Sequence, residues 1–374
     1  MNKTLFKLHS WMALAAFVPL LVICVTGSIL VFKHEIDTLL MEDKVRVQAE
    51  GRQRQSLDAL LADVNGSFPD YEVVGWHLFQ DPGRADQVYL MQRGGSDWSY
   101  TLLNQYSGEM LASPQGLTHY LTDWLLDLHY TLLLDDPGLA ITSVFSVLLC
   151  LLGISGLVLY RRFWKNFFTL RWKARLIVYF SDLHKMTGVI ASPVLLIVGF
   201  TGAWWNISHF AHELEEHADG AEHHVMQERL YGSALSLQAL HDDSVRRLNG
   251  FEPTYISLPW EPGVNITFWG DVHSGNPLLS QYASNVSYDA GSGDYITAFD
   301  IREAGAGAKI VDSYRRLHFG DFAGLASRML WCVVGLSPLL LSVTGLYIWY
   351  RRREKRRNAR IKRRNLRFSP GGAL

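Results

Sequence analysis

The sequence predicts a membrane protein with four transmembrane helices in two parallel repeats and two α+β domains outside the membrane. Three observations predict this fold class. Charged residues form 19% of the 374-residue chain, and they avoid four apolar stretches of about twenty residues, each long enough to cross a bilayer as a helix. Lysine and arginine gather at the ends of these stretches. The two halves of the chain also repeat the same motifs at matched spacing.

The expected organisation alternates membrane and outside segments. We expect transmembrane helices at 1–32, 129–160, 184–207 and 318–350, with apolar cores at 11–32, 138–160, 186–207 and 330–350. The α+β domains cover 33–128 and 208–317, a short loop covers 161–183, and a basic tail covers 351–374. Each core except the second contains a proline, which membrane helices tolerate better than soluble ones. The first span is too long for the apolar part of a signal peptide, so we expect it in the mature protein.

Basic residues set the expected orientation. Six follow the second span between Arg161 and Arg175, and eleven lie in the tail between Arg351 and Arg367. The two long segments are rich in acidic residues instead. The positive-inside rule therefore places both termini and the short loop in the cytoplasm and both long segments outside. We interpret the tail as an orientation and lipid anchor rather than a nucleic-acid arm, since the net charge of −1 argues against a nucleic-acid partner.

An internal duplication connects the halves. A Leu-His pair opens each repeat (His9, His184); Thr-Gly follows seventeen residues later, and a second histidine (His34, His209) follows twenty-five residues later. A second Leu-His pair (His129, His318) precedes the even spans, and the glycine of a Ser-Gly-Leu or Thr-Gly-Leu motif follows it after twenty-seven residues. Each outside segment carries a short helical pattern, alternating strand-like runs and a Ser-Gly-acid turn typical of hairpins. Both repeats begin on the cytoplasmic side, so they are expected to be parallel.

Six of the fourteen histidines therefore sit at span ends. Each could be a headgroup anchor, but that role does not explain matched duplication. Imidazoles from different helices that meet inside an apolar bundle can hold six-coordinate haem b. We expect two haem b groups, with iron bound by His9 and His184 on the cytoplasmic side and by His129 and His318 outside. His34 and His209 are the alternative outer pair. A straight helix advances about 37 Å between His9 and His34 and completes close to seven turns, which would place both rings on one face. Glycines of the spans would admit a flat porphyrin or allow close helix packing.

Other metal chemistry has weaker support. Zinc or copper is less favoured at these histidines because no carboxylate or cysteine accompanies them at fixed spacing. Cys24, Cys150 and Cys332 lie singly in apolar spans and are expected to pack there. A second cluster, His209, His212, His217, His223 and His224, lies among glutamates; it fits a metal site or, more simply, a solvated helix extension.

These motifs resemble the PepSY-associated transmembrane family over essentially the whole chain. The resemblance lies in Leu-His at four span starts, Thr-Gly late in the odd spans, and Trp/Tyr with Arg-Arg closing the even ones, as at Tyr160-Arg161-Arg162 and Trp349-Tyr350-Arg351-Arg352. Within that family the chain is similar to haem-containing siderophore reductases of bacterial inner membranes. The resemblance implies periplasmic PepSY-like domains, and it maps the family's Leu-His positions onto His9, His129, His184 and His318.

The resemblance also implies a function: reduction of Fe(III) in a periplasmic ferric siderophore, of hydroxamate type, followed by release of iron. No nucleotide or flavin motif is present, so the electron donor is expected to be a quinol, a cytoplasmic reductase or a separate flavoprotein. The alternatives are a non-enzymatic sensing or regulatory PepSY module and a siderophore permease component. No catalytic residue is predicted. Aromatic residues that could dock the chelate, but that equally fit a sheet core, are Trp76, Trp98, Tyr100, Trp260 and Trp269.

Overall fold

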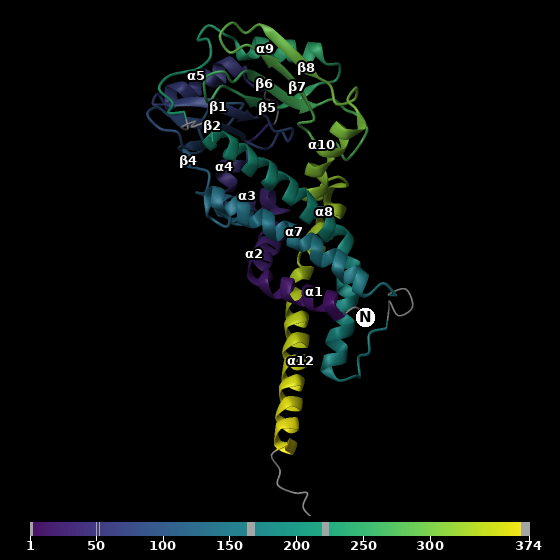
Figure 1. Ribbon diagram of the computed structural model, residues 1–374. Helices are drawn as coiled ribbons and strands as arrows, with labels where there is room; N and C mark the ends of the chain where they lie inside the picture. Colours follow the sequence, from purple (N-terminus) through teal and green to yellow (C-terminus); the bar gives the residue numbers. More distant parts are fainter. Residues whose placement is uncertain (1–2, 50, 52, 163–168, 219–223, 368–374) are drawn as a thin grey trace, which may run out of the picture. The chain divides into compact units, whose positions relative to one another are not determined.

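The computed structural model describes residues 3–49, 51, 53–162, 169–218 and 224–367 (Figure 1). The chain divides into two compact units. Unit 1 comprises Met1–Val31, Leu128–Ala211 and Met329–Leu374, and unit 2 comprises Phe32–Asp127 and His212–Arg328. Each unit therefore combines segments from both halves of the sequence.

Unit 1 is helical and apolar. Its helices are α1 (Lys3–Ala15), α2 (Phe17–Leu30), α7 (Asp135–Leu159), most of α8 (Leu176–Ala218), the end of α11 (Gly324–Gly335) and α12 (Ser337–Arg367). Three helices are long and apolar enough to cross a membrane, or four if the bent pair α1 and α2 counts as one span. Helix α1 packs on α7 and α12. The chain is thus a membrane protein, and its free cysteines are half-buried among these helices.

The first span is broken, which corrects one expectation. Helices α1 and α2 meet at Ala16 at an angle of 65°. Pro19 lies one turn beyond the break; it has no N–H to donate to the carbonyl of Ala15, and its ring crowds that carbonyl. His34 lies on a further helix, α3 (Lys33–Leu40). His9 and His34 therefore do not share one face of a straight helix.

Two other spans are longer than the sequence predicts. Helix α8 has 43 residues; it starts inside the expected cytoplasmic loop and continues through Pro193. Helix α12 continues to Arg367, through the described part of the basic tail. Arginine, lysine and glutamate are good helix formers, so charge ends an apolar segment without ending its helix. A break at Leu336 separates α11 from α12, two residues before Pro338.

Unit 2 contains one antiparallel sheet of eight strands in the order β4-β3-β2-β1-β5-β6-β7-β8. The two outside segments were expected to form separate domains, and this expectation was wrong: β1 pairs with β5, so the first strands of the two halves join them into a single sheet. The strands are β1 (Tyr71–His77), β2 (Asp86–Gln92), β3 (Trp98–Leu103), β4 (Gln115–Gly116), β5 (Glu252–Ser257), β6 (Ile266–Asp271), β7 (Ser284–Tyr288) and β8 (Tyr295–Phe299).

The halves of the sheet match at their junction. Leu78 donates its N–H to the carbonyl of Thr254, and Leu258 donates its N–H to the carbonyl of Val74. The register of β1 with β2 shifts between Val73 and Gly75, and that of β5 with β6 shifts between Pro253 and Tyr255. A bulge is a specific feature of a strand pair, so its recurrence at the matched place reflects the repetition in the sequence.

The turns and helix starts match as well. Gly108 and Gly293 adopt φ of 77° and 76° in the two Ser-Gly-acid turns, a conformation that glycine adopts without steric cost. The predicted hairpins are confirmed, because Leu103 bridges Met110 and Tyr288 bridges Tyr295 across these turns. Helices α5 (Leu57–Ser67) and α9 (Leu237–Arg247) each begin after a serine whose hydroxyl accepts a backbone N–H three residues on.

The core of unit 2 lies between α5, α9 and one face of the sheet, where both helices are seen over the strands (Figure 1). Successive strand residues point to opposite faces. Trp76 and Ile256 face this core and are fully buried. Their neighbours His77 and Tyr255 therefore face the other side of the sheet, which α5 and α9 do not cover. The remaining helices of unit 2 are α3, α4 (Glu42–Val45), most of α6 (Leu121–Tyr130) and α10 (Ala306–Phe319).

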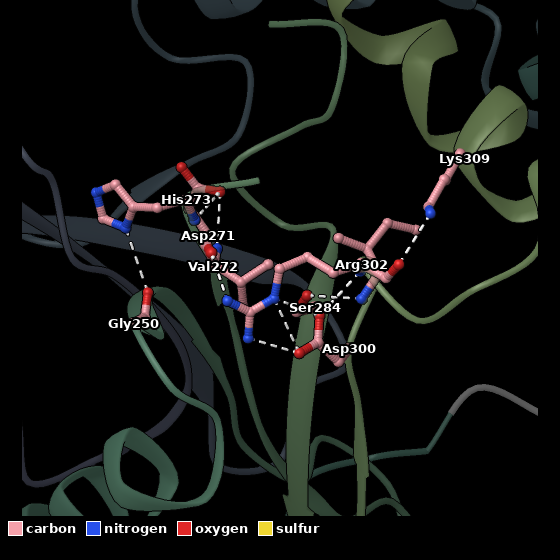
Figure 2. A network of polar contacts seen from close by, with 9 residues as sticks. Gly250, Asp271, Val272, His273, Ser284, Asp300, Arg302 and Lys309 are labelled. Atoms are coloured by element: carbon pink, nitrogen blue, oxygen red, sulfur yellow. Dashed lines mark hydrogen bonds and ion pairs between the residues drawn. The ribbon is translucent and has the colours of Figure 1, made fainter. Parts of the chain in front are cut away.

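A polar network fixes the start of α10 (Figure 2). Arg302 donates to the carbonyl of Val272 at 3.1 Å and to the carboxylate of Asp300 at 3.0 Å. Lys309 donates to the carbonyl of Arg302 at 2.9 Å, and Ser284 accepts the N–H of Ile301. The connection from β8 to α10 is thereby tied to strands β6 and β7. Helix α10 carries Arg315 and His318.

Candidate haem-ligand site

His9 is held by a neighbouring helix. It lies on α1, and its Nδ1 is 2.7 Å from the hydroxyl oxygen of Ser155 on α7. The next residue on α7 is Gly156, where a Cβ would lie 3.6 Å from Cε1 of His9. The ring therefore rests beside a hydroxyl and a glycine.

His184 has the same kind of seat, by which we mean a hydroxyl group and a glycine of another helix that contact the imidazole ring. It lies on α8, and its Nδ1 is 2.9 Å from the hydroxyl oxygen of Thr344 on α12. A Cβ at Gly345 would lie 3.3 Å from Cε1 of His184. The carbonyl of Leu341, one turn before Thr344, also interacts with this ring by hydrogen bonding.

His129 lies on α6, and residues of α2 form its seat. Its Nδ1 is 2.8 Å from the carbonyl oxygen of Ile23 and 3.3 Å from the hydroxyl oxygen of Thr26. A Cβ at Gly27 would lie 2.6 Å from Cε1 of His129, closer than real Cβ contacts. Glycine is required here for the ring to approach the helix. The turn after His129 is strained, with positive φ at Leu132, Leu133 and Asp135.

The three seats share one arrangement. A serine or threonine, followed by glycine, holds Nδ1 of a Leu-His histidine from another helix. The sequence shows these Ser-Gly and Thr-Gly pairs at fixed spacing, but we expected their glycines to admit porphyrin or to pack helices. At Gly27, Gly156 and Gly345 the nearest neighbour is an imidazole ring. Bonding through Nδ1 orients the ring, as in many metal-binding histidines.

His9 and His184 both belong to unit 1. The pair predicted for the cytoplasmic side therefore lies within one unit, on α1 and α8. The donors are two imidazoles from different helices, each with Nδ1 at hydrogen-bond distance from a hydroxyl. This donor set fits the axial positions of haem b.

The model of the family described as "PepSY-associated TM region" matches residues 6–352, nearly the whole chain and all three seats. The chain belongs to the PepSY-associated TM family. It is also 27% identical over 261 residues to "Uncharacterized protein PA4219" of Pseudomonas aeruginosa, an alignment that covers 64% of this chain and 66% of that protein, slightly less than two thirds of its length.

In this PepSY-associated protein the predicted outer pair divides between the units. His129 belongs to unit 1 and His318 to unit 2, so their pairing stays a prediction. His318 lies near the end of α10, which stops at the left-handed Gly320 before α11 begins. It was expected to begin the fourth span helix itself. His129 lies likewise on α6, ahead of α7.

The alternative outer histidines have different surroundings. His34 is half-buried in unit 2; its Nδ1 has no hydrogen-bond partner in the described ranges, and burial lowers its pKa. His209 is exposed on α8. The acidic histidine cluster cannot be assembled from the described side chains, because His223 and Glu222 lie outside the described residues, and so does the side chain of His217.

The aromatic candidates divide into core and partly buried residues. Trp76 is fully buried and donates to Asp86 at 2.7 Å. Tyr100 is buried and donates to Asp123. These two are core residues, the simpler of the two expectations. Trp98 and Trp260 pack together with ring centroids 5.9 Å apart, and Trp269 is half-buried.

Proposed function

We propose that this chain is an inner-membrane di-haem b oxidoreductase that passes electrons across the bilayer to Fe(III) of a periplasmic ferric siderophore. The observation that carries the proposal is the pair of seats at His9 and His184. Two imidazoles from different helices of unit 1 each have Nδ1 engaged by a hydroxyl. Nε2, the usual iron-binding nitrogen, takes no part in these two contacts.

The composition of the site supports haem over zinc or copper. Among the described residues, no group of three or more histidine, cysteine, aspartate or glutamate side chains could hold a metal ion. A protein zinc site needs three or four such ligands. Bis-imidazole ligation of haem needs only two, because the porphyrin supplies the other four donors.

The proposed orientation follows from charge. Arginine and lysine dominate the C-terminal half of α12, from Arg351 to Arg367, and the segment after α7, so we propose that both termini are cytoplasmic and that unit 2 is periplasmic. We further propose that the halves are parallel repeats about an axis along the membrane normal. The matched bulges at Val73 and Pro253 support this arrangement. One haem site near each membrane surface would then provide an electron path.

The chemistry assigned to the chain's own residues is positioning. When bound, haem b supplies a one-electron carrier whose potential depends on its axial ligands. Ser155 and Thr344 fix the orientation of His9 and His184 because each hydroxyl oxygen accepts a hydrogen bond from Nδ1–H, which makes the imidazole a stronger electron-pair donor to a metal. An external donor, a quinol or a cytoplasmic reductase, supplies each electron. Fe(III) of the chelate becomes Fe(II), which hard oxygen ligands hold far less tightly.

The proposal is tested with the full chain purified in detergent from haem-replete cells. Bis-histidine haem b gives a sharp Soret band and split α and β bands after dithionite reduction. We expect H9A and H184A to lose about half of the haem, since each removes an axial ligand of one of two sites. The control is H273A, because the side chain of His273 is 62% exposed. This variant should keep both haem groups.

Two outcomes would reject the proposal. A colourless wild-type protein would leave a sensing module or permease component as the remaining functions. Full haem retention in both H9A and H184A would reject the inner site. The reductase step is scored separately, by mixing the dithionite-reduced protein with a ferric trihydroxamate and following reoxidation; unchanged spectra would show that such a chelate is not its substrate.

A further inference from the structure

A cluster of aromatic rings surrounds His77 on the face of the sheet that α5 and α9 leave uncovered. His77 pairs with Tyr255 across the junction of β1 and β5, and their ring centroids are 4.7 Å apart. Phe79 stacks on His77 at 5.4 Å, and Tyr282 lies at 6.1 Å. All of these residues belong to unit 2.

Two guanidinium groups flank this cluster. Cζ of Arg84 lies 3.5 Å from the ring centroid of Phe79, and Cζ of Arg315 lies 4.7 Å from that of Tyr282. Both groups act electrostatically on His77. Within the described ranges, neither guanidinium forms a hydrogen bond or an ion pair. Stacking on a ring holds a guanidinium flat while its N–H groups stay available in the ring plane.

The carboxylates that act electrostatically on Arg84 form no ion pair with it among the described residues. Asp37 and Asp81 lie within its electrostatic range. Asp37, however, is bound by Lys33 and by the hydroxyl of Thr122. Asp81 accepts the backbone N–H of Gly83 at 2.9 Å. Arg84 is half-buried, and burial lowers its pKa. Partial removal of a cation from water without a hydrogen-bonded partner favours the binding of an anion there.

Two histidines point to the same conclusion. Nδ1 of His77 and Nδ1 of His34 are buried without a hydrogen-bond partner in the described part of the chain, and Arg84 acts electrostatically on both rings. Burial lowers the pKa of His77 to about 4, so at neutral pH this ring is uncharged. The positive charge of the cluster thus comes from its arginines. Buried polar atoms usually have partners, and a polar ligand would supply them.

We propose that Arg84 and Arg315, with the rings of His77 and Tyr282 between them, dock an anionic, aromatic oxygen-donor chelate of Fe(III) of the catecholate class. The inference rests on the proposed reductase function and names its substrate class. A catecholate presents two adjacent oxygens that suit a guanidinium fork, and its ring can stack on tyrosine or histidine. A tris-catecholate of Fe(III) is triply negative, whereas a tris-hydroxamate is neutral and aliphatic. The charge of this site favours the former.

The test uses gallium chelates, because Ga(III) has the charge and size of Fe(III) but is not reduced under these conditions. The purified full chain is titrated calorimetrically with gallium tris-catecholate and gallium tris-hydroxamate. We expect the tris-catecholate to bind at least tenfold more tightly. The proposal is overturned if the hydroxamate complex binds as tightly or more tightly. Haem plays no part in this readout, so a colourless protein would reject the proposed function without deciding the binding result.

Variants locate the site. R84Q and R315Q should each weaken tris-catecholate binding about tenfold or more, the usual effect of losing one charge-assisted contact. The matched control is R246Q, since Arg246 is exposed and paired with Asp243 on α9; it should bind like wild type. R84K keeps the charge but not the planar fork, so its affinity for the tris-catecholate should lie between those of the wild type and R84Q. If R84Q lowers the unfolding temperature, its weaker binding no longer locates the site, and the affinity of R315Q is used instead. Wild-type affinity in folded R315Q would place the chelate elsewhere.

Discussion

The hydroxyl oxygen of Ser155 lies 2.7 Å from Nδ1 of His9, and the hydroxyl of Thr344 stands in the same relation to His184. A hydroxyl oxygen that accepts a hydrogen bond from Nδ1–H raises the basicity of the imidazole and would stabilise the ferric state of an iron bound at Nε2. A net contribution of about 1 kcal/mol per hydrogen bond corresponds to roughly 40 mV for one electron. These hydroxyls are therefore expected to lower the potential of the inner site.

The first prediction follows from this relationship. S155A and T344A should each raise the midpoint potential of one haem by roughly 40 mV and loosen its binding while leaving both ligands in place. S155T and T344S keep the hydroxyl and serve as matched controls. Potentiometric titration followed by the α band measures the shift. Potentials that are equal in the alanine and hydroxyl-bearing variants would show that these contacts do not tune the iron.

Glycine substitutions should give a graded series, because the three seats differ in clearance. A Cβ would lie 2.6 Å from Cε1 of His129 at Gly27, 3.3 Å from His184 at Gly345, and 3.6 Å from His9 at Gly156. G27A should therefore destabilise the fold most, by about 1–3 kcal/mol. G345A should have a smaller effect and G156A almost none. Thermal unfolding in detergent measures the order, and an inverted order would contradict the ring positions.

These seats could not be predicted in full from the sequence. Spacing identified the histidines and the Ser-Gly and Thr-Gly pairs, but His9 and Ser155 are 146 positions apart. Their contact depends on how α1 packs on α7, which no local pattern specifies. The bend at Ala16 is a further reason, because it turns His9 away from the straight helix axis assumed for the first span.

The sheet shows the same division between local and long-range information. The turns at Gly108 and Gly293 were predictable because their residues determine local φ and hydrogen bonding. The union of β1 with β5 was not. Residues in β1 such as Trp76 indicate a buried face, but the pattern of a strand does not specify which other strand will pair with its edge. The cluster around His77 was missed for the same reason, because its residues come from separate elements that include β1, β5 and α10.

Protonation of His77 should make stability depend on pH. Burial, together with the charges of Arg84 and Arg315, lowers the pKa of His77 from 6.5 to about 4 in the folded protein. Between these values the unfolded chain binds more protons than the folded one, so stability falls as pH drops from about 6.5 to 4 and levels off below. The loss reaches about 3 kcal/mol at most. H77F keeps the stacking on Phe79 but cannot be protonated.

Thermal unfolding followed by tryptophan fluorescence checks this dependence. Between neutral pH and a pH of about 4.5, the window set by the two pKa values, the unfolding temperature of the wild-type protein should fall further than that of H77F. H273F provides a control at an exposed histidine. An equal loss in the wild type and H77F would mean that His77 does not carry the effect.

The proposed outer ligands can be tested in a background that lacks the proposed inner haem site. We expect H9A/H129A and H9A/H318A to be colourless, whereas H9A/H34A and H9A/H209A should keep one haem. The reason is orientation: Ile23 and Thr26 hold the ring of His129, whereas His209 is exposed and Nδ1 of His34 has no partner in the described residues. Pyridine haemochrome spectra give the stoichiometry, with H9A/H273A as the control. One retained haem in H9A/H129A together with its loss in H9A/H34A would assign the outer site to the alternative pair.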